Sequence, residues 1–196
     1  MAYEYRKLSP KEREEVARIR KERGYPLHAP PHPVRVNGYY LITAACFDHA
    51  PLMQSASRRT EFEARLFAGL MLIQAEAIAW VVLSNHYHFL ACIEDFASLP
   101  VMMKRLHTGT SFEWNRADGC TGQRRVWYHY SDRFMRAENQ MIQAFNYVHY
   151  NPVKHGVVES PYDWAWSSLS LYEQDHGREW IRERWLKFPP RGVDFE

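Results

Sequence analysis

Two apolar segments joined by a very short turn place the strongest constraint on how this chain folds. Residues 76–83 and residues 86–93 are both largely apolar, and only Ser84-Asn85 separates them. Two strand-like runs with so short a connection predict an antiparallel β-hairpin. The remaining elements are therefore predicted around this hairpin.

The segments around the hairpin predict an α+β domain. Strands are expected at residues 39–43 and 125–130, and helices at residues 59–72, 99–116 and 138–150. The last helix should end near Asn151, because Pro152 disfavours the helical conformation of the residue before it. The order β-α-β-β-α-β-α predicts a ferredoxin-like fold, with an antiparallel sheet and helices on one face.

The predicted organisation has three regions. Residues 1–34 form a charged N-terminal extension whose helix begins with a Ser9–Glu12 capping box and is followed by a proline-rich linker at residues 29–33. Residues 35–156 form the main domain, and residues 157–196 form a Trp-rich C-terminal extension. The N-terminal helix is interpreted as a solvated element or a DNA-backbone contact. The C-terminal extension either packs on the domain or binds a partner.

Composition limits the class of protein without naming a partner. The 196 residues are 46% hydrophobic and 24% charged, which is typical of a globular domain, and the net charge of +2 does not by itself indicate nucleic-acid binding. The three cysteines fit neither a disulfide framework nor a zinc knuckle, so a reduced, cytoplasmic setting is expected. No apolar run is long enough to predict a membrane span.

His86 and His88 lie in the second strand of the predicted hairpin. Residues two apart in a strand point to the same face, so the two imidazoles should lie side by side with Tyr87 turned away. Neighbouring imidazole nitrogens are suited to a divalent metal. The competing interpretation is a pair of core histidines, because one His-x-His pair arises easily among 10 histidines.

Tyr147 and Asn151 lie four residues apart on the last predicted helix. This spacing places them on one face, one turn from each other, where both can face the sheet. The alternative is structural: a half-buried packing tyrosine and an asparagine that caps the helix C-terminus.

Two motifs taken together resemble a known family. Asn-His-Tyr-His at residues 85–88 follows an apolar strand, and Asn-Pro-Val-Lys-His-Gly at residues 151–156 follows about sixty residues later, four residues after Tyr147. This combination resembles the REP-associated tyrosine transposases of the HUH superfamily. The resemblance extends over about residues 38–168 and includes Trp-Ala-Trp-Ser-Ser at residues 164–168. Tyr87 is larger than the usual middle residue, and the N-terminal extension is also a departure.

The resemblance implies a role for each matched residue. His86, His88 and Asn151 correspond to the ligands of a divalent metal, Mg²⁺ or Mn²⁺, and Tyr147 corresponds to the nucleophile. Tyr150 points in a different helical direction from Asn151 and is the weaker candidate. The implied activity is cleavage and transfer of single-stranded DNA near hairpins through a 5′-phosphotyrosine intermediate, in DNA transposition or repeat-element mobilisation.

The implied partner is single-stranded DNA with hairpin structure. Basic residues near the motifs are candidates for phosphate contacts, although each is also explained as an ordinary surface charge: Lys104, Arg105, Arg124, Arg125, Arg133, Arg136, Lys154 and His155. The expected protein is a monomer or homodimer, in the cytoplasm with the nucleoid and without membrane attachment. Two rival functions are a non-catalytic DNA- or RNA-hairpin-binding regulator and a metal hydrolase of small phosphodiesters that uses water as nucleophile.

Overall fold

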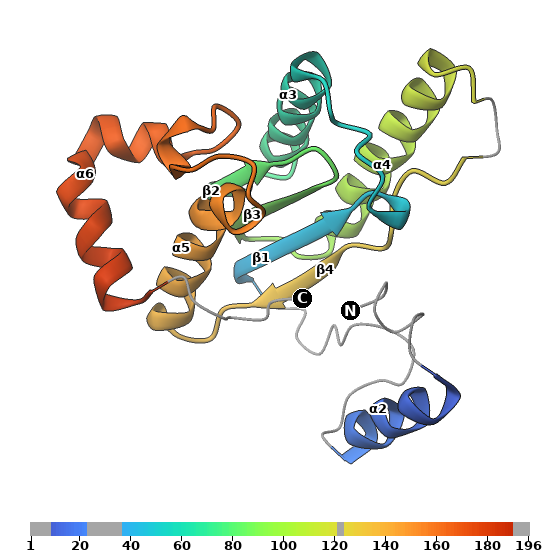
Figure 1. The fold of residues 1–196 in the computed structure, drawn as a ribbon, viewed down its shortest axis with the longest axis horizontal. Helices are drawn as coiled ribbons and strands as arrows, with labels where there is room; N and C mark the ends of the chain where they lie inside the picture. The colour runs from blue at the N-terminus through green and yellow to red at the C-terminus, as the bar shows by residue number, and fades with distance from the viewer. Residues whose placement is uncertain (1–8, 23–36, 121–123, 190–196) are drawn as a thin grey trace. The chain divides into compact units, whose positions relative to one another are not determined.

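A computed structural model of the chain describes residues 9–22, 37–120 and 124–189 (Figure 1). The described residues divide into two compact units, with residues 9–22 in the first and residues 37–120 and 124–189 in the second. The predicted proline-rich linker at residues 29–33 lies outside the described residues. The second unit keeps residues 157–189 together with the sheet, and the predicted boundary at residue 156 stays a prediction.

The first unit contains helix α2 (Pro10–Glu22). Its start is the predicted capping box: the Ser9 hydroxyl accepts from the Glu12 N–H, and the Glu12 carboxylate accepts from the Ser9 N–H at 2.7 Å. The helix also carries an exposed ion pair between Arg18 and Glu15, at 2.6 Å. Such a pair is characteristic of a solvated helix surface.

The second unit is built on a four-stranded sheet. Its strands are β1 (Gly38–Ala45), β2 (Glu76–Val82), β3 (His86–Ile93) and β4 (Ser131–Phe134), in the order β2-β3-β1-β4. All pairs are antiparallel, so the predicted hairpin and the predicted sheet type are confirmed. The central position of β3 is what makes it suitable to carry a site, because strands flank it on both sides.

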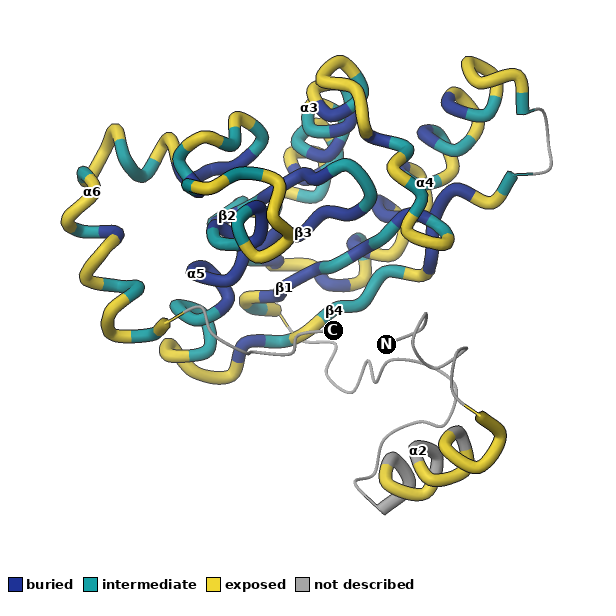
Figure 2. The backbone as a smooth tube through the Cα atoms, in the orientation of Figure 1, coloured by how far each residue is buried: buried dark blue, intermediate teal, exposed yellow. Residues whose placement is uncertain are grey.

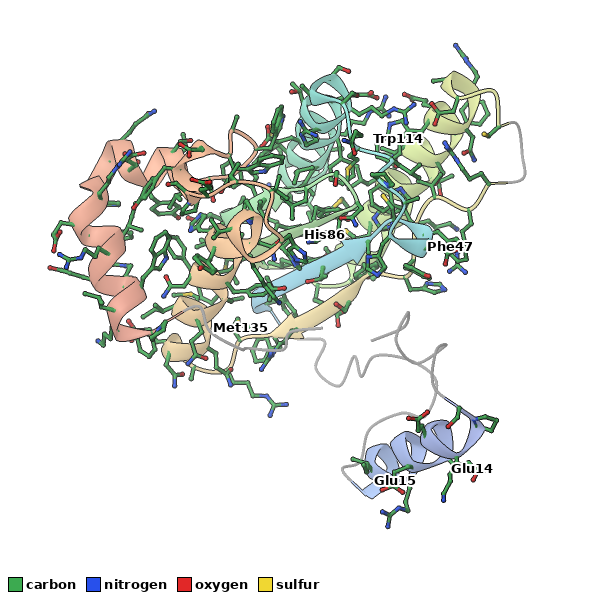
Figure 3. The ribbon with its side chains drawn as sticks, viewed as in Figure 1. Glu14, Glu15, Phe47, His86, Trp114 and Met135 are labelled. Atoms are coloured by element: carbon green, nitrogen blue, oxygen red, sulfur yellow. The ribbon has the colours of Figure 1, made fainter. Side chains whose placement is uncertain are left out.

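Helices α3 (Ala56–Leu72) and α4 (Ser98–Ala117) cover one face of the sheet. The core between them and the sheet is closely packed; for example, the Tyr87 and Phe62 ring centroids lie 4.6 Å apart. Alternate residues of β1 and β3 enter this core with apolar residues of both helices, among them Tyr40, Ile42, Phe89, Ile93, Leu66, Leu70, Met103 and Trp114. Trp114 is labelled in Figure 3.

Helix α5 (Glu138–Lys154) lies on the opposite face of the sheet, against β2 and β3. The α+β prediction is confirmed, but the expectation of helices on one face has to be corrected. The residues of β3 that point away from α3 and α4 include the two histidines, and α5 covers them: the His88 and Tyr147 ring centroids are 5.1 Å apart. Helix α6 (Leu169–Lys187) contacts α5 and is itself mostly exposed (Figure 2).

Two predicted boundaries were wrong. The fourth strand was expected at residues 125–130, but Trp127 is buried in the core and forms only an isolated bridge to Cys46, and regular pairing with β1 begins at Ser131. Helix α5 was expected to end near Asn151 but continues through Pro152 to Lys154, and the Asn151 carbonyl accepts from the His155 N–H at 3.1 Å. Among the described helices, none has both the length and the apolar character to cross a bilayer.

Candidate active site

His86 and His88 lie side by side on the face of β3 that α5 covers, with ring centroids 5.2 Å apart. Both are buried, at 8% and 3% exposure. The Nδ1 atom of each ring is already engaged: that of His86 with Asn85 Oδ1 at 2.6 Å, and that of His88 with Thr43 Oγ1 at 2.7 Å. Both Nε2 atoms are therefore left for other partners. His86 is labelled in Figure 3.

Burial keeps both imidazoles neutral. It lowers the pKa of His86 to about 3, with a further contribution from His155, and it lowers the pKa of His88 well below its ordinary value, with a further contribution from His86. A neutral imidazole carries one nitrogen lone pair, which is the form that binds a metal.

The hydrogen bonds of Asn85 fix which nitrogen of His86 carries that lone pair. The Asn85 amide donates from Nδ2 to the His49 carbonyl at 3.2 Å, so its Oδ1 faces His86 and accepts from the Nδ1–H. The Nε2 of neutral His86 is then an acceptor, and it lies 3.0 Å from Asn151 Oδ1, a second acceptor. Two acceptors at this distance need a cation or a proton between them.

Tyr147 and Asn151 reach the histidines from α5. Their i,i+4 spacing places both on the sheet side of the helix, and both are buried, Tyr147 at 3% exposure. The Tyr147 ring lies edge-on to His88, while the Asn151 amide reaches His86. The structure thus brings together all four residues that the family resemblance singled out.

Lys154 and His155 lie at the solvent side of this cluster. The Lys154 ammonium is 5.0 Å from the centre of the Tyr147 ring, and the His155 ring centroid is 4.7 Å from that of His86. Both residues are exposed. The rim of the site next to the tyrosine is therefore positively charged.

The donor set fits a divalent cation. Within residues 9–22, 37–120 and 124–189, no three His, Cys, Asp or Glu side chains cluster to hold a metal, so a site here needs the amide of Asn151 as its third ligand. His88 Nε2 and Asn151 Nδ2 are buried atoms with no hydrogen-bond partner among the described residues. Two neutral imidazoles and one amide oxygen suit a metal that keeps open positions for substrate.

The other basic residues proposed for DNA contact are scattered. Arg133 is exposed and pairs with Leu41 in the sheet register, which places it on the histidine face. Arg136 is exposed just after β4, whereas Lys104 and Arg105 project from α4, which covers the other face.

The side chains of Arg124 and Arg125 contact neighbouring residues of the protein. The Arg124 guanidinium pairs with Asp118 at 2.7 Å, and that of Arg125 lies 4.8 Å from the centre of the Phe47 ring.

The supporting roles of Thr43 and Asn85 were not predicted from the sequence. Thr43 lies opposite His88 in the β1–β3 register, so only the alignment of the two strands reveals it. Asn85 precedes the first histidine in the turn, where an asparagine is unremarkable on turn chemistry alone. Their contacts with the Nδ1 atoms make them the residues that orient both imidazoles.

Comparisons with known proteins support the resemblance found in the motifs. No family model matches the chain. A curated protein from Haemophilus influenzae (strain ATCC 51907 / DSM 11121 / KW20 / Rd), described as a "Putative REP-associated tyrosine transposase", is 29% identical over 52% of this chain. The match covers 66% of that protein, just under two thirds of its length.

A solved structure shares the fold. It is a REP-associated tyrosine transposase bound to a REP hairpin, with a TM-score of 0.59 and 20% sequence identity. The alignment covers 77% of this chain and 87% of the other. The resemblance predicted from the two motifs is therefore confirmed, and the chain is a relative, in sequence and in fold, of the REP-associated tyrosine transposases.

Proposed function

We propose that this protein cuts and rejoins single-stranded DNA beside hairpins, with Tyr147 as the nucleophile and a divalent metal held by His86, His88 and Asn151. One observation carries the proposal: a single helix presents a phenol and an amide oxygen to two neutral, oriented imidazoles. A packing tyrosine and a helix cap do not explain this convergence. A location in the cytoplasm beside the nucleoid is part of the same proposal.

A bound Mg²⁺ or Mn²⁺ would polarise the scissile phosphate and offset the charge that develops on its oxygens. The protein's own contribution is orientation. Asn85 and Thr43 hold the imidazoles, and α5 holds Tyr147 and Asn151 on one rigid element. The nucleophile and one ligand therefore keep a fixed spacing.

The chemical step is a transesterification. The Tyr147 oxygen forms a bond to phosphorus while the bond from phosphorus to the 3′ oxygen of the preceding nucleotide breaks. The phenol proton is released, and the leaving oxygen takes up a proton to become a free 3′-hydroxyl. A 5′-phosphotyrosine remains, and it conserves the bond energy that a second 3′-hydroxyl uses when it attacks to rejoin the strand.

Lys154 contributes charge at the point where the strand would enter. Its ammonium near the Tyr147 ring attracts the DNA backbone and stabilises negative charge developing nearby. Arg133 extends positive charge on the same face. The solved relative is bound to a REP hairpin, which supports a DNA hairpin as part of the substrate here.

The test is the covalent intermediate itself. A 3′-labelled DNA strand with a hairpin is incubated with the protein and Mn²⁺, and the products are separated under denaturing conditions. The wild-type protein should carry label, and Tyr147→Phe should carry none. Tyr150→Phe is the matched control, since Tyr150 lies on the same helix but against Trp185, with ring centroids 6.2 Å apart. Label retained by Tyr147→Phe would refute the assignment.

A second candidate is a hairpin-binding protein without cleavage. The observation that favours it is the burial of Tyr147, which is 3% exposed and beneath Lys154. Tight binding of the hairpin, with no adduct in Mg²⁺ or Mn²⁺ across several flanking sequences, identifies this function instead.

A further inference from the structure

The segment of residues 164–168, here called the Trp-Ser strap, runs along the outer edge of β2. The Val82 N–H donates to the Trp166 carbonyl at 2.9 Å, and the Ser168 N–H donates to the Trp80 carbonyl at 3.1 Å. An isolated bridge joins Val81 to Ser167 between them. Because β2 is the first strand in the sheet order, the strap satisfies backbone groups that an edge strand would otherwise expose.

The strap is anchored to α3 by a buried arginine. The Arg59 guanidinium lies 3.8 Å from the centre of the Trp166 ring and 5.0 Å from that of Trp164. Arg59 also donates to the Met53 carbonyl at 3.0 Å, and the Trp166 indole N–H donates to Thr60 at 3.0 Å. The strap is thus fixed to the same sheet and helix that form the core.

One hydroxyl connects the strap to the helix that carries Tyr147. Ser168 Oγ accepts from the Trp80 N–H of β2 at 3.0 Å and shares a hydrogen bond of 2.6 Å with His149 Nε2 of α5. Ser168 and His149 are both fully buried. Burial lowers the pKa of His149 to about 3, so this imidazole is neutral and the contact is an uncharged hydrogen bond.

His149 lies behind the helix relative to the reactive residues. Two residues along a helix correspond to a rotation of roughly 200°, so His149 and Tyr147 occupy opposite flanks of α5. On one flank, Tyr147 packs on His88, and on the other, His149 is held by the strap. A rotation of α5 about its axis has to break the Ser168 bond, and it moves Tyr147 and Asn151 together.

We propose that the Ser168–His149 hydrogen bond is a positioning contact that holds α5 in the rotation at which Tyr147 and Asn151 meet the histidine pair. The proposal rests on the proposed function for its effect on cleavage, and on structure alone for its effect on the helix. Ser168 and His149 do not touch the reacting groups. They act through the orientation of α5.

The experiment compares Ser168→Ala with Ser167→Ala in the full chain. Ser167 is buried in the same strap, but among the described residues its hydroxyl accepts from the Leu169 N–H, at 3.3 Å, and makes no bond to α5, so it is a matched control. His149→Phe removes the other partner and keeps a ring against Phe145, whose centroid lies 4.2 Å from that of His149. Ser168→Ala keeps the apolar packing of α5 but also removes the acceptor of the Trp80 N–H, whereas His149→Phe leaves that bond in place. An effect of the contact with α5 must therefore appear in both variants.

Three measurements are made on each variant: hydrogen exchange of the α5 amides, hairpin affinity and the single-turnover rate of adduct formation. Ser168→Ala should speed exchange within α5 and lower the adduct rate by about 10- to 100-fold, the range typical of a misplaced reactive group. Hairpin affinity should stay unchanged. A general loss of stability would instead lower both the adduct rate and the hairpin affinity. The double variant Ser168→Ala/His149→Phe should form the adduct no more slowly than the slower of the two single variants, because both substitutions remove the same hydrogen bond.

The outcomes separate the two proposals. If Ser168→Ala matches Ser167→Ala in both exchange and adduct rate, the positioning role is wrong. If the wild-type protein forms no adduct, the proposed function fails, and the exchange of the α5 amides still decides whether the contact fixes the helix. Faster exchange with an unchanged adduct rate overturns the link between the contact and Tyr147.

Discussion

At the scale of single residues, the Asn151 amide decides whether the histidine cluster is a metal site. As described, its Oδ1 faces the Nε2 of His86, and both atoms are acceptors. A cation ligated by both atoms removes the conflict. The competing arrangement turns the amide so that its Nδ2–H donates to His86, which requires no metal. Substitutions of Asn151 distinguish these arrangements.

Asn151→Asp should retain or strengthen Mn²⁺ binding, because a carboxylate keeps the ligand oxygen and adds charge. Asn151→Leu should weaken it at least tenfold, since it has a similar size but no ligand atom. Direct titration with Mn²⁺, followed by electron paramagnetic resonance, measures both without DNA. Equal Mn²⁺ affinity in the two variants would exclude Asn151 as a ligand.

A second residue-scale prediction concerns Asn85, which holds the Nδ1–H of His86. Asn85→Ala should reduce Mn²⁺ affinity by about 10- to 100-fold, as loss of such supporting partners does in other metal sites. Thr43→Val should act similarly through His88, because it removes the hydroxyl at nearly constant volume. Ser84→Ala, in the same turn, is the control. Unchanged Mn²⁺ affinity in Asn85→Ala would show that His86 is oriented by packing alone.

At the scale of elements, local patterns predicted most of the fold and missed what tertiary packing decides. The hairpin and both helices of the α3–α4 layer follow from apolar periodicity, as the burial of Phe62, Leu66 and Leu70 shows. Strand β4 was missed because Ser-Asp-Arg-Phe has no apolar alternation and is held as a strand by pairing with β1. Trp127, which looked like a strand residue, instead fills the core.

The candidate site was predictable in its members but not in its surroundings. His86, His88, Tyr147 and Asn151 stand out by spacing together with resemblance. Their convergence depends on α5 crossing the face opposite α3 and α4, which no local pattern specifies. The end of α5 was also predicted wrongly. Pro152 disfavours helix at the residue before it, yet Pro152 is buried and α5 continues past it.

The docking of α4 on the sheet provides a test of pH dependence. His107 of α4 shares a hydrogen bond of 2.8 Å with the Tyr87 hydroxyl of β3, and burial lowers the pKa of His107 to about 4. In the unfolded chain a histidine titrates near 6.5. Between these values the unfolded state binds more protons, so the stability contributed by neutral His107 is complete above about pH 6.5 and is lost as pH falls towards 4.

His107→Gln should therefore flatten the decline of unfolding free energy between about pH 6.5 and 4, by up to about 1.4 kcal/mol per pH unit. Urea unfolding at several pH values measures the slope. The other buried histidines contribute equally to both proteins and cancel. An identical slope in His107→Gln would mean that His107 binds its proton equally well in the folded and unfolded states, and the lowered pKa would be wrong.

At the scale of the whole molecule, one chain contains every part of the proposed site. The histidines come from β3, the tyrosine and amide from α5, and the strap that holds α5 from the segment before α6. Exchange of α5 between two copies would have to break the Ser168–His149 bond and uncover the buried face of the helix. The proposed site is accordingly expected to work within a single chain, whether the protein is a monomer or a homodimer.

Mixing two inactive variants tests this expectation. His86→Ala keeps Tyr147, and Tyr147→Phe keeps the histidine pair. If each chain uses its own tyrosine, the mixture should form no adduct at any protein concentration, because no single chain has both parts. A dimer that exchanged α5 would instead rebuild about a quarter of the sites, each from the histidines of one chain and the tyrosine of the other. Adduct that rises with protein concentration in the mixture, while each variant alone stays inactive, would place the tyrosine in trans. The Ser168–His149 contact within one chain would then exist only in the monomer, before α5 is exchanged.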